Sequence, residues 1–161
     1  MCRKFICEKL DNKKNLNMNN SVLKYLGKEK YSNQGNYDNT EGCVNVLSYH
    51  PLGGELLKVE CASFSGRGVI TSTGSLGDII KESIFLSFAY LKSHAKEFEI
   101  DFSEFTDKDY FVHLTVDGIK KDGPSAGVSI VSSLLSLIKK KIIANNISMS
   151  GEISLSGKIL K

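Results

Sequence analysis

The sequence lacks the segments that membrane proteins and zinc proteins need. Its longest apolar segment, residues 128–138, is interrupted by serines and is too short to span a bilayer, and residues 1–14 contain no continuous apolar stretch of a secretory leader. The four cysteines form no Cys-x-x-Cys pair, and the three histidines do not lie at ligand spacing beside them. We therefore expect no membrane segment and no bound metal, and a reducing compartment.

A strong charge of one sign is also absent. Twenty-one Lys and Arg against 18 Asp and Glu leave a net charge of +3, too little for a surface that neutralises many phosphates, so nucleic-acid binding is not expected. No Gly-x-x-x-x-Gly-Lys-[Ser/Thr] loop is found, so we expect no ATP site in this chain. The 161 residues, 41% apolar and 24% charged, have the composition of about one globular domain with its own core.

Residues 1–42 differ in composition from the rest. Asn, Lys, Gly and Tyr dominate there and the apolar residues have little periodicity, so we predict a largely irregular linker with at most a short helical turn at residues 21–26. From Cys43 onward, short apolar runs alternate with glycines. This change predicts one folded domain over residues 43–161.

Strand and helix patterns alternate within that domain. Apolar residues at steps of three and four from Ile80 to Phe98 predict an amphipathic helix of about five turns, and Pro124 suits the first turn of a second helix that continues to Ile138. The arrangement predicts an α/β (α+β) fold, with a mixed sheet and two main helices packed on it. The predicted strands are residues 43–49, 55–64, 69–73, 110–116, 147–149 and 153–155.

The most unusual segment, Lys-Lys-Asp-Gly-Pro-Ser-Ala-Gly at residues 120–127, opens the second helix. Its small residues leave the first-turn amides uncovered, and free amides at a helix N-terminus stabilise an oxyanion. Ser125 would lie beside those amides and could attack a carbonyl if a base is near. On spacing alone, Asp122 and Ser125 are more commonly helix caps.

A nucleophilic serine needs a base, and the residues leave the identity of that base open. His113 lies on the preceding strand, but alternation places it on the face opposite to Val112 and Leu114, and nothing directs it toward Ser125. A lysine whose pKa is lowered by burial is the other option. The lysines near in sequence are Lys120, Lys121, Lys158 and Lys161.

Two motifs, Asp-Gly-Pro-Ser-Ala-Gly at residues 122–127 and Met-Ser-Gly-Glu-Ile-Ser-Leu-Ser-Gly at residues 149–157, resemble one known family. They are similar to the proteolytic domain of Lon, an ATP-dependent protease with a Ser–Lys dyad. Matches in the same order from about residue 20 to residue 160 make the resemblance specific. The further matching segments are residues 24–27, 52–55, 59–60, 65–68, 73–78 and 81–83.

The resemblance implies roles for individual residues. Ser125 takes the position of the nucleophile, and Asp122 that of the acidic residue before it. Ser150 stands where the family usually has a threonine that orients the lysine amine, so a hydroxyl is retained. Further implied positions are Glu60 and His113, which line or support the active site, and Gly123, Pro124 and Ala126 at the helix start that holds the oxyanion.

The chain departs from the family pattern in two places. The family's dyad lysine follows the motif that here ends at Leu160, and Lys161 stands in the place of a proline, so we expect the chain to stop before that lysine and to be inactive alone. Residues 113–120 also lack the Pro and Glu-Gly-Ala of the family and carry Thr115, Val116 and Asp117 instead.

The resemblance implies a serine endopeptidase domain that cleaves damaged or regulatory proteins, in the bacterial cytoplasm or an organelle such as the mitochondrial matrix. The family assembles as a ring, usually of six, so unfolded or regulatory proteins and copies of the same chain are the expected partners. ATP and Mg²⁺ would belong to the family's ATPase domain and not to this chain.

Two alternatives stay open at this point. One is a Lon-like scaffold or assembly domain without a dyad, which the missing lysine favours and the intact Asp-Gly-Pro-Ser sequence disfavours. The other is a small-molecule kinase, because a Gly- and Ser-rich helix start that follows a strand also cradles phosphate.

Overall fold

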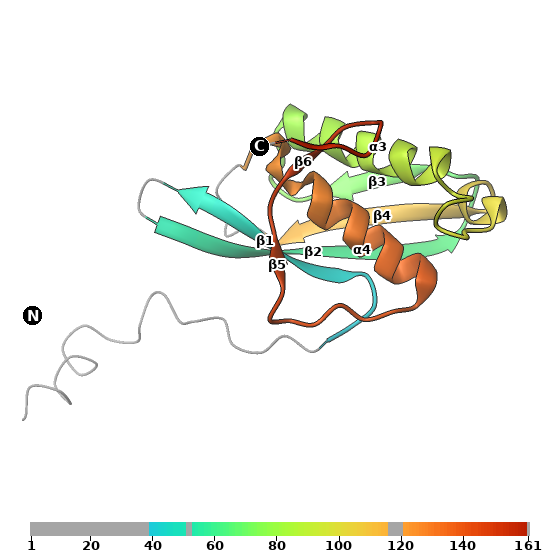
Figure 1. Cartoon of the computed structure of the whole chain (residues 1–161), viewed down its shortest axis with the longest axis horizontal. Helices are drawn as coiled ribbons and strands as arrows, with labels where there is room; N and C mark the ends of the chain where they lie inside the picture. Colours follow the sequence, from blue (N-terminus) through green and yellow to red (C-terminus); the bar gives the residue numbers. More distant parts are fainter. Residues whose placement is uncertain (1–38, 51–52, 116–120, 161) are drawn as a thin grey trace, which may run out of the picture. The chain divides into compact units, whose positions relative to one another are not determined.

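The computed structural model describes residues 39–50, 53–115 and 121–160 (Figure 1). Most of the predicted linker, including the helical turn at residues 21–26, lies outside these ranges. Its last residues belong to the folded unit, because Cys61 N–H donates to the Gly42 carbonyl (2.8 Å) and Gly42 N–H donates to Ser136 Oγ (3.0 Å). The folded part therefore begins a few residues before the boundary expected at Cys43.

A mixed five-stranded sheet forms the centre of the fold, in the order β3-β4-β2-β1-β5. The β1–β2 and β2–β4 pairs are antiparallel, and the edge pairs β3–β4 and β1–β5 are parallel. This arrangement confirms the predicted mixed sheet. The strands of this sheet are β1 (Cys43–His50), β2 (Gly53–Ser65), β3 (Ile70–Thr73), β4 (Lys108–Thr115) and β5 (Ser148–Met149).

Alternation along β4 explains which face of the sheet is covered. Tyr110, Val112 and Leu114 are buried, whereas the residues between them are only half-buried. This period of two is the pattern of a strand with one face on the core.

A separate antiparallel ladder, β6 (Glu152–Ile153) with β7 (Ile159–Leu160), follows β5. The predicted strand at residues 153–155 is shorter than expected, because Gly157 N–H donates to the Ser154 carbonyl and turns the chain back. β7 was not predicted, since a two-residue strand leaves almost no periodic signal.

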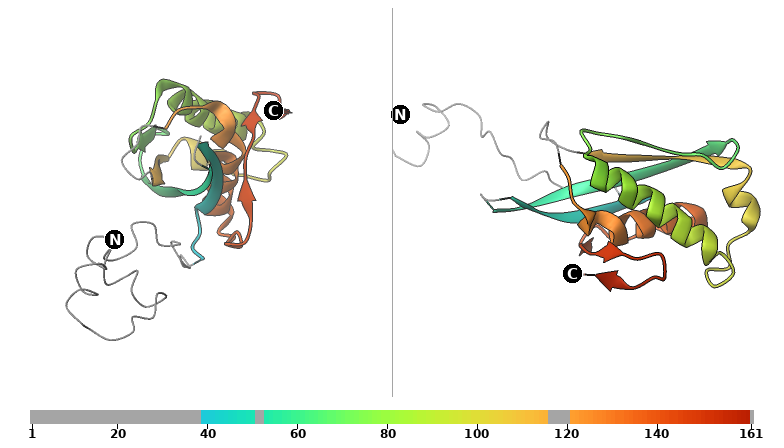
Figure 2. Two further views of the ribbon diagram at one scale, coloured as in Figure 1. Left: turned by 90° about the vertical axis from the view of Figure 1, so that its left-hand side faces the viewer. Right: turned by 90° about the horizontal axis from the view of Figure 1, so that it is seen from above.

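Two helices, α3 (Asp78–Ser93) and α4 (Gly127–Lys139), pack on one face of the sheet and against each other (Figure 2). The first helix is shorter than the five turns predicted. Ser93 Oγ (2.9 Å) and His94 N–H (3.0 Å) both donate to the Tyr90 carbonyl, and residues 94–99 continue as turns. The apolar periodicity of the sequence extends beyond the end of α3, because the turns still bury Ala95 and pack Phe98 against the core.

Buried hydroxyls on α4 form hydrogen bonds to the segment just before β1 and to β5. Ser133 Oγ donates to the Gly42 carbonyl (2.5 Å), and Ser129 Oγ donates to the Met149 carbonyl (3.0 Å). Both hydroxyls are fully buried, and each is satisfied by a backbone carbonyl. The serines that interrupt the apolar run of this helix are therefore structural.

The apolar core lies between the sheet and the two helices. Phe88 of α3 contacts the rings of Phe105 (centroids 5.5 Å apart) and Tyr110 (5.3 Å). Further side chains that are at most 1% exposed in this core are Val59, Ile84, Leu91, Val112, Leu114, Ile130 and Leu134. Neither helix, nor any other in the described ranges, is long and apolar enough to cross a membrane.

Leu134→Ala should lower the free energy of unfolding by about 2–5 kcal/mol, because Leu134 is fully buried and its truncation leaves a cavity. Leu155→Ala is the matched control: this side chain is 54% exposed, and its truncation should cost less than about 0.5 kcal/mol. Urea unfolding followed by circular dichroism measures both. Equal losses for the two variants would contradict this core.

Candidate active site

Ser125 lies on a single turn of 3-10 helix, η2 (Pro124–Ala126), that leads directly into α4. Pro124 occupies the first turn, as predicted, because its fixed φ suits that position and its missing N–H is not needed there. Gly123 precedes the turn with φ 145°, a backbone conformation that side-chain-bearing residues rarely adopt. This geometry leaves the side chain of Ser125 exposed.

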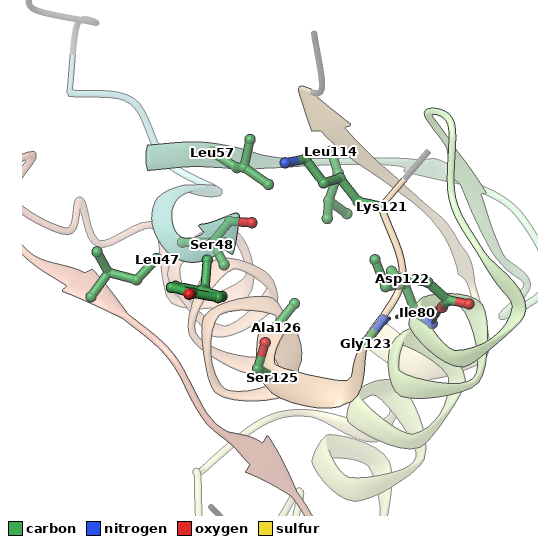
Figure 3. Close-up of a pocket in the computed structure, with 12 residues that line it drawn as sticks. Leu47, Ser48, Leu57, Ile80, Leu114, Lys121, Asp122, Gly123, Ser125 and Ala126 are labelled. Carbon is green, nitrogen blue, oxygen red and sulfur yellow. Dashed lines mark hydrogen bonds between the residues drawn. The ribbon is translucent and has the colours of Figure 1, made fainter. Parts of the chain in front are cut away.

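The exposed Ser125 borders a pocket of about 220 Å³ (Figure 3). The pocket lies between the end of β1, the loop before α4 and the start of α3, and most of the side chains that line it are apolar. Its lining residues are Val46, Leu47, Ser48, Tyr49, Leu57, Ile80, Leu114, Lys121, Asp122, Gly123, Ser125 and Ala126. Of these lining residues, the sequence predicted Asp122, Gly123, Ser125 and Ala126 as site residues, and none of the residues of β1.

Ser150 is brought next to Ser125 by backbone hydrogen bonds. Gly151 N–H donates to the Ser125 carbonyl (2.7 Å), and Val128 N–H donates to the Gly151 carbonyl (3.0 Å). Ser150 itself is exposed. A side chain at Gly151, where φ is 158°, would lie 3.1 Å from Val128 Cγ2 and 3.0 Å from Ile159 Cγ2, so the close approach of the two segments favours glycine here.

The same bonds correct the expectation of several free amides at the helix start. Gly127 N–H donates to the Pro124 carbonyl, and Val128 N–H is taken by Gly151. Gly123 N–H donates to the carboxylate of Asp122 (3.1 Å). Because the turn begins at Pro124, the N–H of Ser125 comes before the first amide that such a turn bonds internally.

Asp122 caps a helix, but not the helix that it precedes. Its Oδ1 accepts from Ile80 N–H (3.3 Å) in the first turn of α3, where Gly77 leaves room for the carboxylate. A Cβ added at Gly77 would lie only 2.1 Å from Asp122 Cγ. Asp122 therefore joins the Ser125 loop to α3, a contact that the spacing of the sequence does not indicate.

Lys121 is committed to an ion pair. Its Nζ lies 2.6 Å from Glu55 Oε2, at the start of β2, and its side chain is only 13% exposed. The Lys121 carbonyl also accepts from Gly77 N–H (2.8 Å). Of the other lysines considered as bases, Lys158 is exposed, and Lys120 and Lys161 lie outside the described residues.

Glu60 and His113 lie together, but apart from Ser125. They are cross-strand neighbours in the β2–β4 register, and each stands between buried residues of its strand, so both lie on the face of the sheet away from α3 and α4. His113 Nδ1 lies 2.9 Å from Thr73 Oγ1, and Glu60 Oε1 lies 3.5 Å from Lys58 Nζ. Neither residue lines the pocket.

Cys61 offers no reactive thiol, and no metal-binding cluster is found in the part of the chain that the structure describes. Burial raises the pKa of the Cys61 thiol to about 12, so this cysteine stays protonated and unreactive at neutral pH. Within residues 39–50, 53–115 and 121–160, no three His, Cys, Asp or Glu side chains form a group that could hold a metal ion.

Comparison with known proteins shows the family of the chain. Residues 17–161 match the family described as the Lon protease (S16) C-terminal proteolytic domain. The chain belongs to this family. Membership supports a protease function and leaves no support for the small-molecule kinase considered above.

Similar curated proteins are Lon proteases of bacteria. The chain is 42% identical over 141 residues to that of Aster yellows witches'-broom phytoplasma (strain AYWB), which covers 87% of this chain and 18% of the relative. It is 38% identical to that of Trichlorobacter lovleyi (87% and 17%) and 41% identical to that of Mesomycoplasma hyopneumoniae (86% and 16%). The chain thus spans less than a fifth of the length of these Lon proteases.

Asp122→Ala should lower the free energy of unfolding by about 1 kcal/mol, because the Lon-type domain loses the acceptor at the start of α3. Asp122→Asn should lose less, since its amide oxygen still accepts from Ile80 N–H. Thermal unfolding measures both. Asp78→Asn is the control, because the exposed Asp78 carboxylate pairs with Lys81 in the same turn (3.4 Å), whereas the Ile80 N–H donates to Asp122. An unfolding temperature for Asp122→Ala equal to that of the control would contradict the capping role.

Proposed function

We propose that this chain supplies the nucleophile of a Ser–Lys endopeptidase, and that the nucleophile is Ser125. The observation that carries the proposal is the exposed Ser125 at the edge of a pocket lined mostly by apolar side chains, with Ser150 held beside it by the two Gly151 backbone bonds. A residue that served only as a helix cap would not need either neighbour.

The proposed reaction is acyl transfer. Ser125 Oγ attacks the peptide carbonyl, a neutral lysine amine takes the hydroxyl proton, and the Ser125 N–H donates to the oxyanion. The lysinium then returns the proton to the leaving amine, and water, deprotonated by the same lysine, releases the acid product. On the resemblance, we propose that this lysine would follow residue 161. Ser150 Oγ would hold its Nζ toward Ser125 as a positioning residue.

The pocket indicates which peptides would bind. Its apolar walls, formed in part by Leu57, Leu114 and Ile80, would take an uncharged apolar side chain of the residue whose carbonyl is attacked. Such side chains, and a backbone free to extend, are available in unfolded or regulatory proteins. We propose these as substrates.

The properties of a complete Lon-type protein are proposed on family membership alone. They are a ring of copies, usually six, and ATP with Mg²⁺ bound by a separate ATPase domain that feeds substrates to this one. The bacterial relatives make the cytoplasm of a bacterium the proposed compartment.

Ser125→Ala should abolish peptide cleavage. The protein to use is a chimera in which this chain is continued by the residues that follow the matched region in the phytoplasma Lon protease, so that the family's lysine is present. Cleavage of a fluorogenic peptide with leucine before the scissile bond measures activity. The unfolding temperature should change little, because a helix-start serine contributes only about 1 kcal/mol.

Two controls make this test specific. Ser132→Ala changes a half-buried serine on α4, and should leave turnover unchanged. The 161-residue chain without the added lysine should not cleave the peptide. Cleavage by the Ser125→Ala chimera at the rate of the unsubstituted chimera would overturn the proposal.

Ser150 should affect turnover rather than stability. In the chimera, Ser150→Ala should lower kcat about fivefold to tenfold, because the lysine amine loses one orienting hydrogen bond of about 1 kcal/mol. Ser150→Thr, which restores the residue usual in the family, should keep activity. The unfolding temperatures of both should match that of the unsubstituted chimera. Equal kcat values for Ser150→Ala and the unsubstituted chimera would show that Ser150 has no part in orientation.

A further inference from the structure

The wall of the pocket away from Ser125 carries a charged side chain. Lys121 runs along this wall in Figure 3, among Leu57 and Leu114, and belongs to the pocket lining. Its side chain is 13% exposed, so its ammonium is largely removed from water. An unpaired cation in such a place is unfavourable beside an apolar ligand and attracts an anionic one.

Glu55 cancels this charge from outside the pocket. It does not line the pocket, yet its Oε2 lies 2.6 Å from Lys121 Nζ, within the range of a charge-assisted hydrogen bond. Glu55 is placed there by the β1–β2 register, in which it is the cross-strand neighbour of Ser48, a lining residue. The carboxylate is 34% exposed, so it is hydrated as well as paired.

The carboxylate of Asp122, the other charged side chain in the pocket lining, also has hydrogen-bond partners. Asp122 lines the pocket, but its Oδ1 accepts from Ile80 N–H and from Gly123 N–H, toward the start of α3. The backbone of Lys121 is fixed as well, by the bond from Lys121 N–H to the Ser75 carbonyl (3.1 Å). The ammonium of Lys121 is therefore held on the wall by its partner and by its own backbone.

We infer that Glu55 is a specificity-determining residue: by pairing with Lys121 it neutralises the pocket wall, so that the pocket accepts apolar side chains and rejects acidic ones. The inference rests on the proposed function, because it concerns which peptides reach Ser125. Loss of the Glu55 charge alone would leave the Lys121 ammonium free to pair with a carboxylate of the bound peptide.

The test is a binding measurement on the full chain and needs no cleavage. Acetyl-Ala-Ala-Ala-Leu-amide and its Glu counterpart are titrated into the ¹⁵N-labelled chain, and the amide shifts of Gly123 and Ala126 give the two dissociation constants. The unsubstituted chain should bind the Leu peptide at least about tenfold more tightly than the Glu peptide. In Glu55→Gln this preference should fall by about tenfold or more, which is the value of one charge-assisted hydrogen bond.

Three variants separate charge from structure. Glu55→Asp keeps the carboxylate and should keep the preference. The double variant Glu55→Gln with Lys121→Met removes both charges and should restore the preference for Leu. Asp78→Asn is the matched control, because it breaks the exposed Asp78–Lys81 pair, neither residue of which lines the pocket, and it should change neither constant.

The inference is overturned if Glu55→Gln keeps the preference of the unsubstituted chain, or if the double variant fails to restore it. Should Glu55→Gln not fold, Lys121→Met alone decides. This variant has no ammonium on the pocket wall and should keep the preference for the Leu peptide. Loss of that preference would overturn the inference, because it would show that the ion pair itself, and not neutralisation of the Lys121 charge, determines which peptide binds. No binding of the Leu peptide to the unsubstituted chain would overturn it too. The proposed function fails by a different result, which is cleavage that survives Ser125→Ala.

Discussion

The site depends on the two hydrogen bonds that join Gly151 to the start of α4. Gly151 N–H donates to the Ser125 carbonyl and the Gly151 carbonyl accepts from Val128 N–H, so Ser150 and Gly151 are held beside the start of the helix. The buried Ser129 hydroxyl continues the contact at Met149. Without these bonds, Ser125 and Ser150 would lie on separate segments, and the base that we propose Ser150 orients would not be held beside Ser125.

A second set of contacts holds the loop in front of Ser125. Asp122 accepts a hydrogen bond from the first turn of α3. The Lys121 N–H donates to the Ser75 carbonyl, and the Lys121 carbonyl accepts from the Gly77 N–H. The loop is therefore fixed to α3 and to the segment between β3 and α3 before it enters the helix. Preorganisation of this kind means that the proposed nucleophile, Ser125, does not have to be ordered when a substrate binds.

Sequence patterns predicted the parts of the fold that have a local period. Val112 and Leu114 alternate with His113 as expected, and Pro124 opens the second helical segment. The end of α3 was predicted too late, because Ala95 and Phe98 pack on the core from turns rather than from a helix. Local periodicity reports burial, and only the backbone bonds at Tyr90 show where the helix stops.

The candidate site was predictable where a motif carries it, as at Ser125 and Ser150. The pairing of Lys121 with Glu55 and the capping of α3 by Asp122 were not, because they join residues far apart in the chain and no spacing rule connects them. The family resemblance implies that Glu60 and His113 line or support the active site, and this stays a prediction. The structure pairs them on the face of the sheet away from α3 and α4, and neither lines the pocket beside Ser125.

The most direct measurement of the central claim is the site of covalent modification by a serine-directed inhibitor. The phytoplasma chimera is treated with a peptidyl diphenyl phosphonate that carries a leucine-like side chain, and the adduct is located by peptide mass spectrometry. The account predicts one phosphonylated residue, Ser125, with loss of peptide cleavage in proportion to labelling. Labelling of Ser150 or another serine, or full cleavage after Ser125 is labelled, would contradict it.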